Sequence, residues 1–151
     1  MESRETQIEI LAGDGNLTEL KRIFDSGYSQ LELDIALENA IAYSRIKMAE
    51  YLLELGADFS NYDYQGTYYA VHNNELEGLK FAIERGVNVN TNEGQLLNTA
   101  IVTVYNTKDP TTLNYLLEKG ADLKFLSKKI MDAFENSEIK EIKKNATQHG
   151  V

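Results

Sequence analysis

Hydrophobic residues along the chain recur with helical spacing, and the pattern returns about every 30 residues. In RIKMAEYLLELG, the residues Ile46, Ala49, Leu52 and Leu53 fall on one stripe of a helix. The same stripe returns in NNELEGLKFAIERG and in DPTTLNYLLEKG. Apolar positions three and four residues apart are typical of amphipathic helices, whereas strands alternate. The pattern therefore predicts an all-α chain.

A glycine closes each of these helical segments and sets the register of the repeat. The four glycines are Gly27, Gly56, Gly86 and Gly120, with spacings of 29, 30 and 34 residues. A small or apolar residue precedes each glycine by 16 positions in the first three segments and by 20 in the fourth; these residues are Leu11, Ala40, Ala70 and Ala100. Glycine readily takes the left-handed conformation that ends a helix. We therefore expect two short helices per segment, the second of them ending at the glycine.

The fourth segment has a longer connection, since its four additional residues fall within YNTKDPTT. There Asp109 is expected to cap the second helix and Pro110 to be its first residue. The six-residue spacing returns once more with Ala133 and Ile139. A single helix pair cannot bury its apolar stripe alone, so neighbouring pairs are expected to stack on one continuous core. The segment from residue 125 to 146 would then cap the last pair, with Ile139 and Ile142 facing inward.

The repeated units resemble ankyrin repeats. Gly-Ala-Asp recurs in ELGADFSN and EKGADLK, with a weaker copy in ERGVNVN, each after a leucine-bearing helix. The Thr-Pro-Leu-His motif of the family is mostly missing, and Ala36-Leu37-Glu38 stands where Pro-Leu-His would be. The resemblance implies an all-α ankyrin-repeat solenoid with finger-like turns between repeats. It would form one domain over residues 1–151, with repeats at 6–29, 35–60, 66–90 and 95–122 and capping helices at 125–146.

The charge of the chain is strongly acidic and unevenly spread. The net charge is −9 over 151 residues, and residues 1–60 carry 12 acidic and 5 basic side chains, a net charge of −7. Such a surface repels a phosphate backbone, so nucleic-acid binding is not expected, whereas a basic protein partner would be attracted. Acidity for solubility alone is the alternative. No apolar stretch predicts a signal peptide or a membrane span, which favours a cytoplasmic protein.

Groups that could carry chemistry are few. The chain has no cysteine and two histidines, His72 and His149, and no zinc-binding, Walker or dinucleotide-binding motif occurs. His72 is placed near the end of a first helix, on the side that faces the groove in ankyrin proteins, where a polar contact is its expected role. We therefore expect no enzyme activity, no metal and no cofactor.

Tyrosine is the residue type that best indicates a binding surface, with nine in the chain and no tryptophan. A tyrosine offers a large contact area with few rotamers and one polar group. Ankyrin proteins generally bind through the turns between repeats and the concave helix face. The resemblance therefore places the partner-binding residues at Tyr43, Tyr62, Tyr64, Gln65, Tyr68, His72, Asn73, Asn92 and Thr103. The alternative for Tyr68 and Tyr69 is packing between repeats.

Several functions fit these features. The first is a protein-interaction module without catalysis, monomeric when alone, whose partner is a protein. The second is an acidic immunity protein or antitoxin that neutralises a basic toxin by charge complementarity. An enzyme or small-ligand binder that uses His72 is a third, and a self-associating protein is a fourth. The connection at residues 106–112 is either a tolerated insertion or a specificity element.

Overall fold

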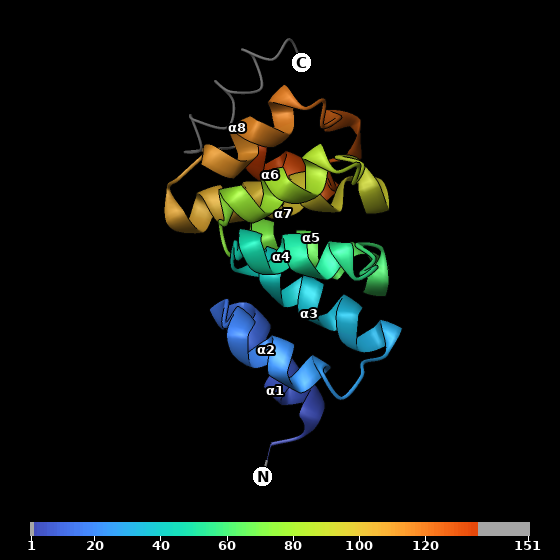
Figure 1. Ribbon diagram of the computed structural model, residues 1–151. Helices are drawn as coiled ribbons and strands as arrows, with labels where there is room; N and C mark the ends of the chain where they lie inside the picture. Colours follow the sequence, from blue (N-terminus) through green and yellow to red (C-terminus); the bar gives the residue numbers. More distant parts are fainter. Residues whose placement is uncertain (1, 136–151) are drawn as a thin grey trace. The chain divides into compact units, whose positions relative to one another are not determined.

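The protein is helical throughout the part of the chain that the computed structural model describes, which is the backbone of residues 2–135 and the side chains as far as residue 132. No strand occurs there, as predicted for an all-α chain. The helices are α1 (Arg4–Asp14), α2 (Leu17–Phe24), α3 (Gln30–Ala42), α4 (Ile46–Glu54), α5 (Asn61–His72), α6 (Leu76–Glu84), α7 (Thr91–Thr107), α8 (Thr111–Glu118), the 3-10 turn η1 (Leu123–Phe125) and α9 (Lys128–Glu135) (Figure 1).

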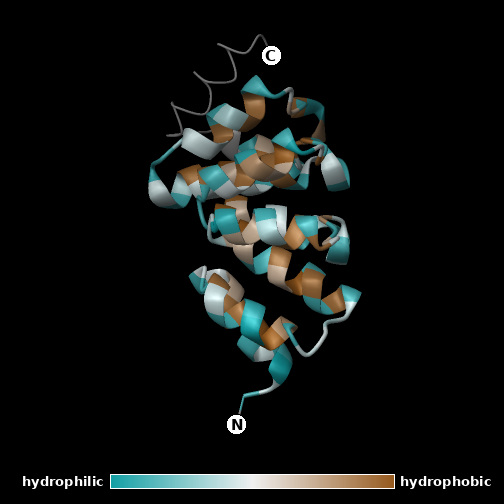
Figure 2. Cartoon of the chain, in the orientation of Figure 1, coloured by the Kyte–Doolittle hydropathy of each residue, from teal (hydrophilic) through white to brown (hydrophobic). Residues whose placement is uncertain are grey.

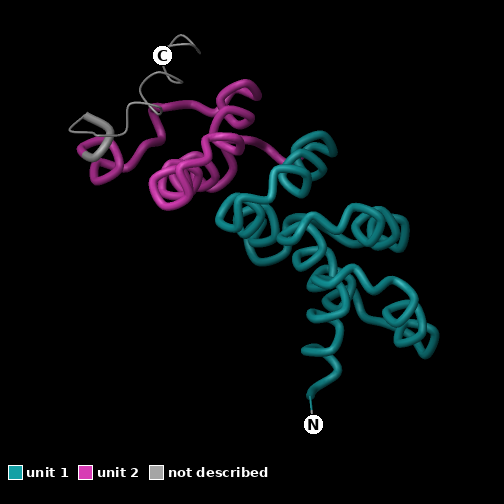
Figure 3. The backbone as a smooth tube through the Cα atoms, turned by 90° about the vertical axis from the view of Figure 1, so that its left-hand side faces the viewer, with its two compact units in different colours: residues 1–86 teal, residues 87–151 magenta. Residues whose placement is uncertain are grey.

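The chain divides into two compact units, residues 1–86 and residues 87–151 (Figure 3). The first unit holds the helix pairs α1/α2, α3/α4 and α5/α6, and the second holds α7/α8, η1 and α9. Each unit is described by itself below. A single repeat domain over residues 1–151 stays a prediction.

Helix α3 is the centre of the first unit, because α1 packs along one side of it and α5 along the other. Most of α3 is buried, including Leu37 and Ile41, and Met48 and Leu52 of α4 complete the core beneath it. Ile46 and Leu53 of α4 are half-buried, so the predicted stripe lies with its middle facing the core. Apolar and polar residues are interleaved along each helix (Figure 2), as stacking of amphipathic helices requires.

The turns repeat in register, as the glycine spacing predicts. The backbone is left-handed at each of the four glycines, with φ between 94° at Gly120 and 110° at Gly27. A second left-handed series, which the sequence did not reveal, separates the two helices of each pair at Gly15, Ser44, Asn74 and Lys108. Its members repeat the same spacings as the glycines. The two series show that one helix–turn–helix geometry recurs four times within the described residues.

Side chains from the start of the first helix hold the glycine turns in place. Arg4 donates to the carbonyl of Gly27 at 2.7 Å, and Gln30 donates to that of Gly56 at 2.9 Å. In the second unit, Asn90 donates to the Gly120 carbonyl at 3.3 Å and accepts the backbone N–H of Asp122 at 2.9 Å. These bonds satisfy backbone groups that the helix ends leave without partners. The turns at Gly27, Gly56 and Gly120 are thus tied to neighbouring helices by side-chain hydrogen bonds.

The additional residues of the fourth repeat mostly lengthen its first helix. Helix α7 has 17 residues, against 13 in α3 and 12 in α5, and it runs through Thr107 before a short connection to α8. The N-cap position of α8 is Pro110, one residue later than predicted, and α8 itself begins at Thr111. Asp109 still accepts the backbone N–H of Thr111 at 3.1 Å, so its carboxylate performs the predicted capping from one position upstream.

The 3-10 turn η1 packs against α7 in the second unit. Asn98 of α7 donates to the Phe125 carbonyl at 2.9 Å and accepts the backbone N–H of Ser127 at 2.9 Å. Gly94 faces Phe125 so closely that a Cβ atom there would lie 2.4 Å from the Cβ of Phe125. Helix α9 falls inside the predicted cap at 125–146. The predicted inward positions of Ile139 and Ile142, like His149, lie outside the described residues, as does the side chain of Ala133.

Candidate functional site

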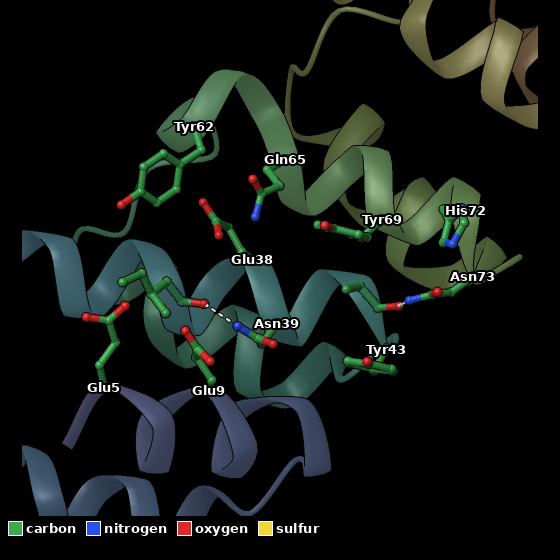
Figure 4. Close-up of a pocket in the computed structure, with 12 residues that line it drawn as sticks. Glu5, Glu9, Glu38, Asn39, Tyr43, Tyr62, Gln65, Tyr69, His72 and Asn73 are labelled. Carbon is green, nitrogen blue, oxygen red and sulfur yellow. Dashed lines mark hydrogen bonds between the residues drawn. The ribbon is translucent and has the colours of Figure 1, made fainter. Parts of the chain in front are cut away.

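A hollow of about 390 Å³ lies along α3 in the first unit, between α1 and α5 (Figure 4). The first helices of three consecutive pairs contribute to it. The residues that line it are Glu5, Glu9, Ile35, Glu38, Asn39, Ala42, Tyr43, Tyr62, Gln65, Tyr69, His72 and Asn73. On α3 these residues are spaced at three and four positions, which places them on one face of the helix. The volume is in the range of sites that hold a side chain or a small ligand.

Glu38 forms the floor of the hollow, and its burial follows from a glycine on the neighbouring helix. A Cβ atom on Gly66 would lie 2.7 Å from the Cα of Glu38, so only glycine allows α5 to approach α3 this closely. Glu38 is 8% exposed, and its Oε1 accepts a hydrogen bond from Asn61 at 2.7 Å. Figure 4 shows its carboxylate directed into the space between Tyr62 and Gln65.

Burial raises the pKa of Glu38 from 4.5 to about 7. Desolvation is the largest cause, because the charged form loses water that the protein does not fully replace. The hydrogen bond from Asn61 acts in the opposite direction, and the nearby carboxylates of Asp34 and Glu9 raise the pKa further. The floor of the hollow therefore changes its charge near neutral pH.

Asp34 is a second buried carboxylate on α3, but it has a structural role. One of its oxygens accepts the backbone N–H of Asp58 at 2.8 Å and the side-chain amide of Gln30 at 2.8 Å. It thereby fixes the turn after α4 onto the start of α3. Asp34 does not line the hollow, so it contributes to the site through its charge alone.

Exposed tyrosines form the rim. Tyr43 is 49% exposed, Tyr62 is 59% and Tyr69 is 41%. Tyr69 stacks on Tyr68 with ring centroids 5.0 Å apart, and both rings meet His72 edge-on at 6.2 and 6.0 Å. The stacking orders the Tyr69 ring at the surface without burying it. Rings held in this way lose little entropy when a partner covers them.

Tyr62 reaches the rim from an unusual stretch of backbone. Tyr62, Asp63 and Tyr64 have φ values of 47°, 53° and 65°, in the left-handed region, within the first turn of α5. The same conformation recurs 30 residues later in the second unit, at Asn92, Glu93 and Gly94. This left-handed stretch lies where the resemblance predicts a finger-like turn, and it belongs to the start of α5 rather than to a separate loop.

The distal end of the hollow is fixed by amides. Asn73, just after α5, donates to the carbonyl of Ala42 at 3.1 Å, and Asn39 donates to that of Ile35 at 3.0 Å (Figure 4). Arg45 similarly donates to the carbonyl of Gly13 at 2.8 Å. The bonds from Asn73 and Arg45 join the turn inside one helix pair to the end of the first helix of the previous pair, and they hold those first helices together.

The structure brings together five of the nine residues predicted to bind a partner. Tyr43, Tyr62, Gln65, His72 and Asn73 all line the hollow. Their role in binding remains a prediction.

The other four lie elsewhere. Tyr64 and Tyr68 are half-buried and outside the lining. In the second unit, Asn92 is exposed and donates to Gln95 at 2.9 Å, whereas Thr103 is buried and donates to the carbonyl of Thr99 at 3.0 Å.

Sequence reasoning missed the acidic members of the hollow and misplaced one tyrosine. Tyr69 was not among the predicted partner-binding residues, with packing between repeats as its alternative, yet it is exposed and lines the hollow. Glu5, Glu9 and Glu38 carry the charge of the site but give no motif in the sequence. Glu38 has one signal, since it stands where the resemblance to ankyrin repeats would place a histidine.

Other site types find no support in the described part of the chain. Among residues 2–135, no three histidine, aspartate or glutamate side chains are grouped so that they could hold a metal ion. None of the described helices combines the length and the apolarity that crossing a bilayer requires.

Comparisons with known proteins give a distant similarity. No protein-family model matches the chain. The chain is 27% identical over 123 residues to BRCA1-associated RING domain protein 1 of Caenorhabditis elegans. The match covers 80% of this chain but 18% of that protein, so the chain spans about a fifth of its length. Together with the recurring helix pairs, this similarity fits a helical repeat protein.

Proposed function

We propose that the protein is an ankyrin-type solenoid that acts as a protein-interaction module without catalysis, and that the hollow along α3 is its contact surface. The observation that carries the proposal is the rim of exposed tyrosines, which come from the end of α3 and from α5, around a hollow that three consecutive first helices line. Tyrosines in such a position are typical of binding surfaces, because they bury much area at little entropic cost.

Two further features support this proposal. The glycine turns and the bonds between pairs make the hollow a preformed surface, which lowers the cost of ordering it on binding. The similar protein from Caenorhabditis elegans is named for its association with another protein, in line with a binding role. The finger at Tyr62 and the distal end at Asn73 would mark the two limits of the contact.

Site-specific photo-crosslinking in cells of the native source tests the proposal. A photoreactive phenylalanine analogue replaces Tyr62 or Tyr69 in the hollow, and Tyr105, which is 58% exposed in the second unit, serves as the matched control. We expect one protein crosslinked from both hollow positions and absent from the control, and we expect the crosslink from position 62 to be lost when Tyr69→Ala is introduced, and the crosslink from position 69 to be lost with Tyr62→Ala. Equal crosslinking from all three positions, or from none, would refute this contact surface.

A further inference from the structure

We propose that the hollow binds an arginine side chain from a basic segment of the partner protein. This inference rests on the proposed function and adds the chemistry of the group that is bound. The inference follows from three properties of the described residues. These are the sign of the charge around the hollow, the buried carboxylate at its floor, and the flat acceptor-rich walls.

The charge around the hollow has one sign. Glu5, Glu9 and Glu38 line it, and neither lysine nor arginine is among the described residues that do so. Arg4 lies on the same helix as Glu5 but pairs with Glu32 at 2.6 Å and with the Gly27 carbonyl. The carboxylates are thus not neutralised by a lining side chain, and a cationic group is the complementary ligand.

The floor of the hollow offers a hydrogen-bond acceptor that the fold leaves unused. Asn61 bonds to Oε1 of Glu38, whereas Oε2 accepts no hydrogen bond from the described part of the chain. The residue is more than nine-tenths buried, and its carboxylate points into the hollow (Figure 4). Among the described residues, Oε2 of Glu38 is not one of the fully buried side-chain atoms that lack a hydrogen bond, so it is open to the hollow and can accept a donor from a ligand.

The walls favour the planar guanidinium of arginine over the ammonium of lysine. The exposed rings of Tyr62 and Tyr69 offer flat faces, on which arginine stacks. The Gln65 side chain makes no hydrogen bond within the described residues and lies beside Glu38. Five N–H donors in a plane can bond to carboxylates and an amide at once, whereas lysine has three donors on a single point charge.

Binding of a cation should depend on pH, and this dependence independently tests whether the Glu38 carboxylate contacts the cation. The titratable groups that act on Glu38 or line the hollow with it are Asp34 on α3, Tyr43 just after α3, Glu5 and Glu9 on α1, and Tyr62, Tyr69 and His72 on α5. A cation favours the charged form of Glu38, so binding releases a proton and tightens as pH rises from 5 to about 8. The variant His72→Gln separates any contribution of the imidazole from that of the carboxylate.

The experiment is an NMR titration of the full chain with the peptide Ac-Gly-Ser-Arg-Ser-Gly-NH₂ and its analogues with lysine or citrulline in place of arginine. Citrulline keeps the shape of arginine but removes its charge. We expect saturable shifts at Asn39, Tyr62 and Tyr69 with arginine, affinity at least about fivefold weaker with lysine, and no saturation with citrulline. Glu38→Gln should weaken the arginine peptide about tenfold at pH 8. The exposed carboxylate change Glu50→Gln should leave the binding unchanged.

Each other result overturns a defined part of the inference. Binding of citrulline equal to that of arginine would reject a cationic ligand, and equal binding of lysine would reject arginine as the side chain. Absence of saturable shifts with any peptide would reject the hollow as a cation site. If a partner protein is still crosslinked from Tyr62 in that case, the proposed interaction function is retained and only the arginine inference is rejected. If arginine binds but no partner protein is crosslinked, the proposed interaction function is rejected and the arginine site is retained.

Discussion

The substitution Glu38→Gln should raise the free energy of unfolding at neutral and alkaline pH, because it removes a charge that the folded protein holds in a buried position. The carboxylate is buried on α3 and has one hydrogen bond, from Asn61. Glutamine keeps an oxygen that can accept this bond, and it needs no charge to be carried in the interior. The variant removes the charge but keeps the size and shape of the side chain, so it measures the free-energy cost of ionising the buried acid without changing the packing around it.

The magnitude and its sign follow from linkage. The pKa of Glu38 is about 7 in the folded protein, against a usual value of 4.5 in the unfolded chain. Between these pH values the folded state binds more protons, so its free energy of unfolding falls as pH rises. At about 1.4 kcal/mol for each pH unit, the loss contributed by Glu38 between pH 5 and pH 8 is about 2–3 kcal/mol. Above pH 8 the contribution becomes constant.

Urea denaturation at a series of pH values, followed by far-UV circular dichroism, measures the effect. The stability gained by Glu38→Gln over wild type should grow by about 2–3 kcal/mol from pH 5 to pH 8. Glu50→Gln, an exposed carboxylate in α4, is the control and should show no such growth. Parallel pH curves for wild type and Glu38→Gln would refute the reasoning, as would an NMR titration of the Glu38 carboxyl centred near its usual value.

Three further predictions concern the packing of the helix pairs. Gly78→Ala should cost about 3 kcal/mol or more in thermal denaturation, because its Cβ would lie 2.1 Å from the Ile41 carbonyl oxygen. Gly56→Ala, with φ of 103° and open space around it, should cost only about 1–2 kcal/mol, and equal losses would contradict the clash. Asn90→Ala should cost about 2 kcal/mol in urea denaturation, because it removes two hydrogen bonds to the Gly120 turn; an unchanged midpoint would count against them. Truncation after Gly120 should cause aggregation or loss of cooperative unfolding, measured by light scattering and circular dichroism, and a soluble, cooperative fragment would oppose a capping role.

The sequence by itself determined the helices, their pairing in the chain and the register of the turns. These features are local, since a 3.6-residue apolar period and a glycine at each helix end act within a few residues of themselves. The glycines at positions 27, 56, 86 and 120 are all left-handed, as their spacing predicts. His72 also ends a first helix, where the pattern places it. The four extra residues were located correctly, but only the structure shows that they mostly extend α7.

The tertiary structure alone decided which residues form the hollow and how they are charged. Glu5 and Glu38 are 33 positions apart, and no local pattern relates them. Their meeting depends on the packing of α1 against α3, and the burial of Glu38 depends on the close approach of α5, which requires the absence of a side chain at Gly66. Burial, which raises the pKa of Glu38, is likewise a property of the neighbours and not of the residue. A periodic sequence specifies where each helix and turn recurs. Which side chains meet in the hollow is set by packing between helices that are far apart in the sequence, and the periodic pattern does not contain that information.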